Sequence, residues 1–191
     1  FELTSATGGP ASDSVEDVVK NADELFAEMD EMLVKLDGQE RKIAVLESIL
    51  MNTHIAEEVF VSGRPIESGW LSSYFGVRKD PFTGMPAMHK GLDFAGEDGA
   101  GVLATGAGVV TWADSRFGYG NLVEIDHGDG VITRYGHNKN LLVQAGDLVN
   151  KGQKIAEMGS TGRSTGPHVH YEVLKSGRQI DPLPYVYRRA D

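Results

Sequence analysis

The N-terminal third of the chain carries apolar residues at alternating steps of three and four, a pattern that predicts a coiled-coil helix. The pattern runs from residue 15 to residue 56, and one position within it, Gln39, is polar. Phe26, Leu33 and Ile49 widen the apolar face beyond a minimal two-stranded seam. The apolar positions of the repeat are Val15, Val18, Ala22, Leu25, Met29, Met32, Leu36, Ile43, Leu46 and Leu50.

Gly38 leaves two arrangements of this helical region open. Glycine inside a helix costs about 1 kcal/mol relative to alanine, and Asp37-Gly38 is also a turn signal. The region forms either one long α-helix or a helical hairpin that turns at Gly38. The apolar positions keep their register across Gly38, which favours one helix. In either form the apolar face needs a cover: a second copy of the chain, another protein, or the chain's own C-terminal domain.

Short polar segments flank the helix. Residues 1–14 contain Gly-Gly-Pro and few apolar side chains, so we expect a disordered lead-in. Residues 57–68 contain Gly63 and Pro65 and are expected to form a linker. Residues 188–191 are expected to form a polar tail.

From residue 69 onward the pattern changes to short apolar runs broken by glycine. All but three of the 24 glycines lie beyond residue 62, a density that helices do not tolerate. Residues 69–187 are therefore predicted to form a small, mainly β domain, as an antiparallel sheet or a partly closed sandwich. The candidate strands are residues 102–104, 109–113, 121–126, 131–135, 142–143, 154–158 and 168–174.

The last candidate strand carries two histidines. Residues 168–173 read His-Val-His-Tyr-Glu-Val, and this alternation predicts a half-buried strand. Residues two apart in a strand point to the same face, so His168 and His170 should project together. Such a pair is either two half-exposed strand residues or part of a metal site.

Other histidines favour the metal site. His89 precedes Asp93 by four residues, and His137 lies in a glycine-flanked segment. A catalytic zinc typically takes three protein ligands from histidine and acidic residues. His89, Asp93 and one of the two strand histidines would supply that set, with His137 as a further imidazole nearby.

Three separated motifs, His-x3-Asp, Tyr-Gly-His and Gly-Pro-His-x-His, occur here in one order. Together they resemble those of the lysostaphin/LytM-type zinc metalloendopeptidases, which cut peptidoglycan. The resemblance covers about residues 69–187. It implies one zinc ion per chain on His89, Asp93 and His170, with His137 and His168 as catalytic residues that do not bind the metal. Some relatives have lost these residues and act as non-enzymatic activators, whereas this chain has all five.

The implied chemistry is peptide hydrolysis by a water that zinc activates. His168 would accept a proton from that water, and His137 would donate a hydrogen bond to the oxyanion; this division of roles comes from the resemblance. The chain lacks His-Glu-x2-His, so the helical zincin arrangement is excluded. Residues 80–86 are expected to wall the cleft, and Arg78 is a candidate for either a substrate contact or a structural role.

Three functional hypotheses follow. The first is an endopeptidase acting on the peptide cross-links of bacterial peptidoglycan, either at a D-Ala–diaminopimelate bond or at a glycine bridge. The second is a non-catalytic coiled-coil activator of a partner cell-wall hydrolase. The third is a scaffold with zinc as a staple, although structural zinc normally has four protein ligands. The helix is expected to mediate homodimerisation or contact with a protein partner, or to mask the cleft.

Charge and composition limit the partners. Residues 1–62 hold 14 acidic and 4 basic residues, whereas the remainder balances at 14 of each. This distribution argues against nucleic acid as a ligand. The chain has no cysteine and no apolar run long enough to span a membrane. We expect a bacterial cell-envelope location, periplasm or cell surface, with any export signal or anchor upstream of Phe1.

The two remaining histidines are not predicted to act in catalysis. His127 lies in a His-Gly-Asp-Gly hairpin turn and is expected to be a turn residue. His54 lies near the end of the helix and is expected to be solvated.

Overall fold

The computed structural model describes residues 15–188, and its side chains from residue 24 onward except those of residues 52, 54 and 56. The expected lead-in 1–14, residues 189–191 of the expected tail, and the side chains of Val15, Val18, Ala22 and His54 lie outside this description. The chain divides into two compact units, residues 1–52 and residues 53–191.

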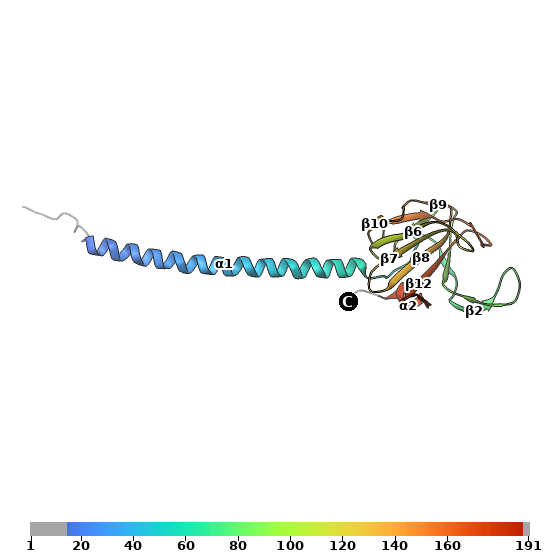
Figure 1. Ribbon diagram of the computed structural model, residues 1–191, viewed down its shortest axis with the longest axis horizontal. Helices are drawn as coiled ribbons and strands as arrows, with labels where there is room; N and C mark the ends of the chain where they lie inside the picture. The colour runs from blue at the N-terminus through green and yellow to red at the C-terminus, as the bar shows by residue number, and fades with distance from the viewer. Residues whose placement is uncertain (1–14, 189–191) are drawn as a thin grey trace, which may run out of the picture. The chain divides into compact units, whose positions relative to one another are not determined.

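The N-terminal region is one continuous helix, α1 (Val15–Val59), which passes through Gly38 without a turn (Figure 1). The cost of one glycine is small beside the helix propensity of the many Leu, Met, Glu and Lys residues around it. An ion pair between Asp37 and Arg41, with Nη2–Oδ2 at 2.7 Å, spans the glycine at i, i+4 spacing. No helix in the described part of the chain is long and apolar enough to cross a membrane.

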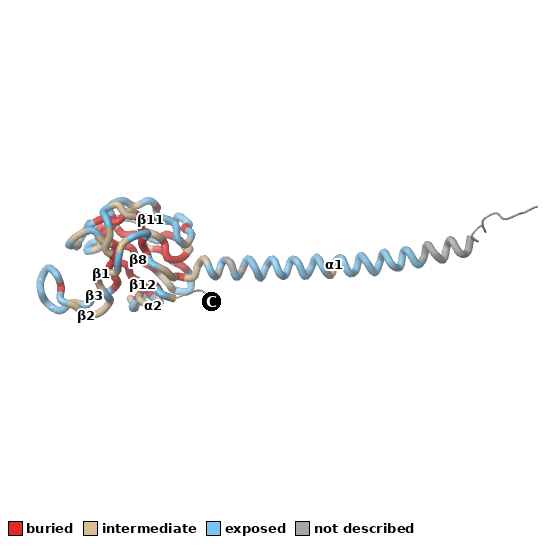
Figure 2. Tube along the Cα trace, turned by 180° about the vertical axis from the view of Figure 1, so that it is seen from behind, coloured by how far each residue is buried: buried red, intermediate tan, exposed pale blue. Residues whose placement is uncertain are grey.

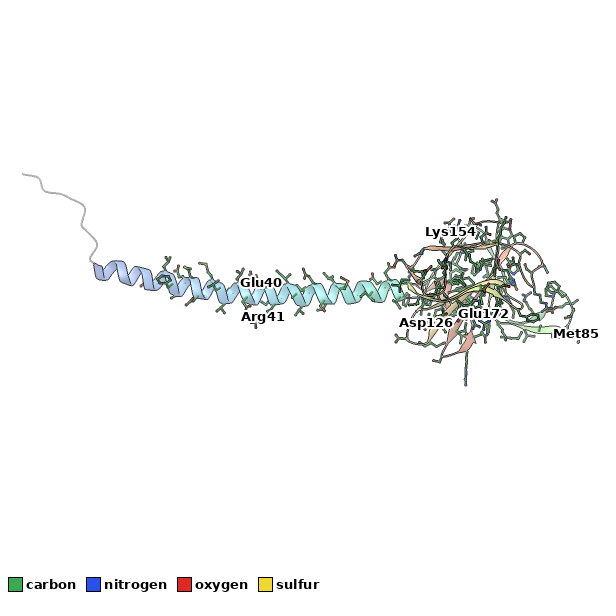
Figure 3. The ribbon with its side chains drawn as sticks, turned by 45° about the horizontal axis from the view of Figure 1, so that its top comes forward. Glu40, Arg41, Met85, Asp126, Lys154 and Glu172 are labelled. Atoms are coloured by element: carbon green, nitrogen blue, oxygen red, sulfur yellow. The ribbon has the colours of Figure 1, made fainter. Side chains whose placement is uncertain are left out.

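The apolar face of α1 is exposed over its described length. Figure 2 shows the described helical residues almost entirely as exposed, and Figure 3 shows side chains standing out around the helix, among them Glu40 and Arg41. The repeat positions Leu25, Met32 and Leu50 are each more than half exposed. Over the described side chains the predicted stripe is therefore present as an apolar surface on the helix, interrupted at Gln39.

The second unit is built on an antiparallel sheet of eight strands among the described residues, in the order β1-β4-β12-β8-β7-β6-β10, with β13 beside β12. The central strands run side by side in Figure 1. The strands of this sheet are β1 (Trp70–Ser73), β4 (Leu92–Ala95), β6 (Gly108–Arg116), β7 (Gly120–Asp126), β8 (Val131–Asn138), β10 (Leu148–Val149), β12 (His168–Lys175) and β13 (Arg178–Ile180).

A second, three-stranded sheet closes the core. It consists of β5 (Gly101–Leu103), β11 (Lys154–Glu157) and β9 (Asn140–Leu141). One apolar cluster contains residues of both sheets, including Val102 and Ile155 from the small sheet and Ile125 and Tyr171 from the large one. The predicted mainly β, antiparallel and sandwich-like class is confirmed. The strand expected at 142–143 lies instead at Asn140–Leu141, and Val143 is a buried loop residue.

A two-stranded hairpin stands beside these sheets. It is formed by β2 (Gly76–Lys79) and β3 (Pro86–His89), and Met85 lies in the loop that joins them (Figure 3). The short strands β1, β2, β3 and β10 are not among the candidate strands, because runs of two to four residues give little periodic pattern.

Residues 57–68 differ from the expected linker. Helix α1 continues to Val59, and Val61 and Ile66 are buried against the β unit. Ile66 forms a β-bridge with Val102, so the segment is part of the fold. Apolar side chains beside Gly63 and Pro65 explain why a composition-based linker assignment failed here.

The C-terminal end is also tied to this segment. After β13 the chain forms the short helix α2 (Leu183–Tyr187). Arg188, the first residue of the expected polar tail, donates from Nε to the Val61 carbonyl oxygen at 2.6 Å and stacks over the Phe60 ring at 3.9 Å.

Candidate metal centre

Paired strands bring the predicted metal ligands together. His89 ends β3, Asp93 lies in β4, and His170 lies opposite Asp93 in the neighbouring strand β12. The segment between β3 and β4 passes so close to β12 that residue 91 must be glycine, because a Cβ there would collide with the carbonyl oxygen of Tyr171. The sequence His-Lys-Gly-Leu-Asp thus turns the chain so that its first and last residues face one point.

The three ligand side chains converge through one atom each. His89 Nε2 lies 3.0 Å from Asp93 Oδ1 and 3.1 Å from His170 Nδ1. His170 Nδ1 lies 2.8 Å from Asp93 Oδ1. All three residues are buried, and among the described residues they form a group able to hold a metal ion.

Each ligand histidine is oriented by an acceptor on its other nitrogen. His89 Nδ1 lies 2.7 Å from the Tyr74 carbonyl oxygen, and His170 Nε2 lies 3.2 Å from Glu172 Oε1. A carbonyl or carboxylate oxygen accepts, so the outer nitrogen of each ring donates its N–H and the inner nitrogen faces the centre. Metal-ligating histidines in proteins are held in this way.

The donor set fits zinc. Tetrahedral zinc binds these ligand types at about 2.0–2.2 Å, which sets ligand atoms about 3.3 Å apart. The observed separations of 2.8–3.1 Å are close to this value. Two imidazoles and one carboxylate match the three protein ligands of a catalytic zinc, whereas structural zinc usually has four.

Two further histidines line the same cleft. His137 Nδ1 lies 2.8 Å from the Thr161 carbonyl oxygen, and His168 Nδ1 lies 2.8 Å from the Gly166 carbonyl oxygen. Their rings are 4.8 Å apart, and His168 Nε2 is 3.8 Å from Asp93 Oδ1. In the neutral form of each ring, Nδ1 therefore donates and Nε2 is the nitrogen that can accept a proton. The structure brings all five predicted residues into one cleft.

His137 has an unusual backbone conformation. Its φ of 67° lies in the left-handed region, which costs a non-glycine residue on the order of 1–3 kcal/mol. Its N–H donates to the Tyr119 carbonyl oxygen at 2.7 Å, and its ring is fixed by Thr161. Such over-determined, strained residues cluster at functional sites.

Burial and hydrogen bonds set the charges of the site. Burial lowers the pKa of His137 to about 4. Burial alone would lower the pKa of His170, but hydrogen bonds to Asp93 and Glu172 raise it to about 9. Burial alone would raise the pKa of Asp93, but hydrogen bonds from His170 and His89 hold it well below its usual range. A metal ion binding to these donors must displace the proton that they share.

Arg78 contacts the metal group directly. Its Nη2 lies 3.1 Å from Asp93 Oδ2, the carboxylate oxygen that is not part of the donor triangle. Arg78 thereby orients the carboxylate so that Oδ1 faces the two imidazoles. Of the two roles predicted for Arg78, a substrate contact or a structural role, this contact supports the structural role.

The cleft has a volume of about 310 Å³, and residues of the 80–86 loop line it as expected. Arg163 Nη2 lies 2.8 Å from both carboxylate oxygens of Asp80 and stacks over the Phe82 ring at 4.7 Å. Hydrogen bonds from the backbone N–H of Thr83 and from the Arg163 side chain lower the pKa of Asp80 to about 2. These contacts join the 80–86 loop to the glycine-rich loop before β12 at the rim of the cleft.

Glu172 and Tyr119 are site residues that the sequence interpretation missed. Tyr119 Oη donates to Glu172 Oε1 at 2.9 Å, and burial together with the Glu172 charge raises the pKa of Tyr119 to about 12. A signal for Glu172 was available, because it lies two residues after His170 on the same strand face. Tyr119, in a β6–β7 loop distant in sequence, carried no such signal.

His127 does not belong to the site. It is buried at the end of β7, where Nδ1 donates to the Ala107 carbonyl oxygen at 2.7 Å and Nε2 lies 2.7 Å from Thr133 Oγ1. It is therefore more than the turn residue expected, because it joins two parts of the core.

Residues 87–182 match the model of peptidase family M23, and the chain belongs to this family. The Pseudomonas aeruginosa lipoprotein NlpD/LppB homolog is 42% identical over 126 residues, 65% of this chain and 42% of the relative. The Vibrio cholerae peptidoglycan DD-endopeptidase ShyA is 42% identical over 121 residues, 62% of this chain and 28% of the relative. The Salmonella dublin murein hydrolase activator NlpD is 38% identical over 123 residues, 64% of this chain and 32% of the relative.

Solved structures show the same fold. A zinc-containing peptidase from Vibrio cholerae has a TM-score of 0.58 and 42% identity, covering 66% of this chain and 39% of that one. The lysostaphin catalytic domain from Staphylococcus simulans has a TM-score of 0.58 and 30% identity, covering 63% of this chain and 93% of that one. The lysostaphin/LytM-type resemblance is confirmed. The chain spans less than half the length of each of the three curated relatives.

Proposed function

We propose that this chain is a zinc-dependent endopeptidase that hydrolyses the peptide cross-links of bacterial peptidoglycan in the cell envelope. The observation that carries the proposal is the donor triangle of His89, Asp93 and His170, whose outer nitrogens are fixed so that the inner lone pairs meet. Membership of family M23 and the similarity to an enzyme named peptidoglycan DD-endopeptidase support the substrate class. Digestion of defined muropeptides distinguishes the two candidate cleavage sites, a D-Ala–diaminopimelate bond and a glycine bridge.

When bound, zinc would supply a Lewis acid and lower the pKa of a water molecule towards about 7. Asp93 and the two ligand imidazoles would hold the ion, and Arg78 and Glu172 orient these ligand side chains. His168 lies on the strand of His170, and its Nε2 accepts a proton from the attacking water.

For His137 we propose a role other than the oxyanion donor that the resemblance implied. With Nδ1–H donated to the Thr161 carbonyl, its neutral Nε2 has no hydrogen to give to an oxyanion. Nε2 of both rings therefore carries no hydrogen at the start of the reaction, and because burial lowers the pKa of His137 to about 4, His168 is assigned as the proton acceptor. The ring that takes the proton becomes the donor for the oxyanion or the leaving amine.

Defined muropeptides and zinc analysis test the proposal together. We expect one zinc per chain and new amino termini detected by mass spectrometry, both lost on chelation. Asp93→Ala should lose zinc and activity, whereas His168→Ala should keep zinc and lose turnover. A zinc-loaded wild-type chain that leaves every defined muropeptide intact contradicts the endopeptidase proposal.

A second candidate is a non-catalytic activator of a partner cell-wall hydrolase. The specific observation in its favour is 38% identity to a relative named murein hydrolase activator NlpD. An activator would stimulate a purified cell-wall hydrolase equally well as wild type and as His168→Ala. The endopeptidase loses its effect in that variant, so the same substitution separates the two candidates.

A further inference from the structure

Helix α1 presents an apolar seam with a defined heptad register. The described a positions are Met29, Leu36, Ile43 and Leu50, and the described d positions are Leu25, Met32, Gln39 and Leu46. The apolar members of this seam are 50–68% exposed. Residues 25–50 of this seam span about 38 Å of helix, which is more than three heptads and long enough for a coiled coil.

The charges beside the seam favour one relative direction of two identical helices. Lys35 and Lys42 occupy g positions, and Glu40 and Glu47 occupy e positions. In a parallel pair each g residue faces the e residue five positions on in the partner, so both lysines meet a glutamate. The remaining charged g residue, Glu28, faces the uncharged Leu33 of the partner subunit, so no like charges meet. In an antiparallel pair centred on this seam g faces g, so Lys35 faces Lys42 of the partner subunit and the lysine–glutamate contacts are lost.

Gln39 adds an independent restriction on register. It is the polar member of the described seam, and a polar side chain at a core position is costly unless it finds a partner. In a parallel, in-register pair it faces Gln39 of the partner subunit, and the two amides can hydrogen-bond. A shifted register would bury the amide against leucine or methionine.

From these three observations we infer that α1 forms a parallel, in-register coiled-coil homodimer. The occupant of the apolar face is a second copy of this chain, because the charge pattern is complementary to itself. Both β units then follow from the same end of the coiled coil. This inference goes beyond the proposed hydrolase activity and does not depend on it.

Cysteine cross-linking of the full 191-residue chain tests direction and register. The chain has no cysteine, so single substitutions give unambiguous products. Leu25→Cys and Leu46→Cys lie at d positions about 32 Å apart along the helix. Identical d residues face each other only in a parallel, in-register pair, so both variants should form disulfide-linked dimers. The control Val34→Cys, on the outer face, should not.

Each other cross-linking result overturns the inference. An antiparallel pair can link at most one of the two d positions, because its symmetry centre cannot lie at both. Equal cross-linking of Val34→Cys indicates random collision. Light scattering must give twice the chain mass of 20.6 kDa. A chain that stays monomeric at all concentrations contradicts the homodimer and indicates that another protein or the chain's own β unit covers the seam. A trimer also contradicts the dimer.

A charge swap tests the proposed contact between Lys42 and Glu47 of the partner subunit. The residues three and four positions from Lys42 are uncharged, so its substitution leaves the isolated helix little changed. Lys42→Glu should raise the dimer dissociation constant about tenfold at low salt, because two attractive contacts become repulsive. Adding Glu47→Lys in the same chain should restore it. An unchanged or tighter Lys42→Glu dimer, or no rescue, overturns the parallel direction.

Discussion

The apolar residues of α1 and those of the β unit are of the same types, but they differ in what covers them. The described apolar seam positions of the helix are 50–68% exposed, whereas Leu122, Ile125 and Ile155 in the β unit are fully buried. Strands with alternating residues expose one apolar face, which a second sheet of the same chain can close. A long helix with a 3.5-residue repeat presents a narrow stripe that matches another helix. The comparison shows that the apolar residues of the β unit are covered within that unit, whereas those of α1 are not covered within the helix itself.

Two isoleucines give the largest expected difference between the regions. Ile125→Ala removes a fully buried side chain and should lower the free energy of unfolding of the β unit by about 2–5 kcal/mol. Ile43→Ala, its matched control on α1, should change that quantity by less than about 0.5 kcal/mol. Both tryptophans, Trp70 and Trp112, lie in the β unit, so their fluorescence during urea unfolding follows this unit. Equal losses in both variants would show that the two regions unfold as one.

Glu172 tests whether the buried part of the β unit also tunes the metal site. Glu172→Gln keeps the shape but removes the carboxylate that accepts the His170 Nε2–H at 3.2 Å. Zinc affinity, measured by competition with a chelating dye, should fall about 10–100-fold. Glu157→Gln, on the small sheet, is the control and should leave affinity unchanged. A zinc affinity equal to wild type in Glu172→Gln would show that this contact does not orient the ligand.

His127 links the core of the β unit to pH. Burial lowers its pKa in the folded state below the usual value near 6.5. Below about pH 6.5 the unfolded chain therefore binds a proton that the folded chain does not, so this contribution to stability is present above that pH and is lost as the pH falls. The loss should approach ~1.4 kcal/mol per pH unit.

The variant His127→Gln isolates this effect from the other histidines. It keeps a donor and an acceptor but cannot titrate, so the difference in unfolding free energy between wild type and variant should shrink between pH 7 and pH 5. Tryptophan fluorescence in chelator at each pH measures it. A constant difference across this range would contradict the buried neutral His127.

The site was predictable because its residues carry sequence signals that depend on strand geometry. His168 and His170 alternate with apolar residues, and His89 and Asp93 stand four apart around Gly91. Local spacing identified these side chains, and the family resemblance assigned their predicted roles. Glu172 lay in the same alternating run, but nothing in the sequence distinguished a carboxylate that orients a ligand from one that faces solvent.

The contacts that the sequence did not predict are long-range. Tyr119 reaches Glu172 across 53 positions, and Arg188 returns to Val61 across 127. A local sequence pattern carries no information about contacts between distant residues. For this reason residues 57–68 were predicted to be a linker and residue 188 to be part of a tail. Helix α1 was predictable from local pattern, because its periodicity extends from residue 15 to residue 56 and outweighs one glycine.

The smallest expected effect comes from neighbouring cations on α1. Arg41 pairs with Asp37 of its own helix at an f position, on the outer face, with both side chains at least 60% exposed. Arg41→Gln should therefore reduce helix stability by only about 0.3–0.5 kcal/mol, seen as a slight loss of far-UV circular dichroism, and leave self-association unchanged. Lys42→Gln, one residue away beside the seam, should instead weaken the dimer measurably at low salt. If both substitutions weaken association equally, the seam does not determine how the helices pair. The proposal that the exposed apolar residues of α1 are covered by a second helix would then be contradicted.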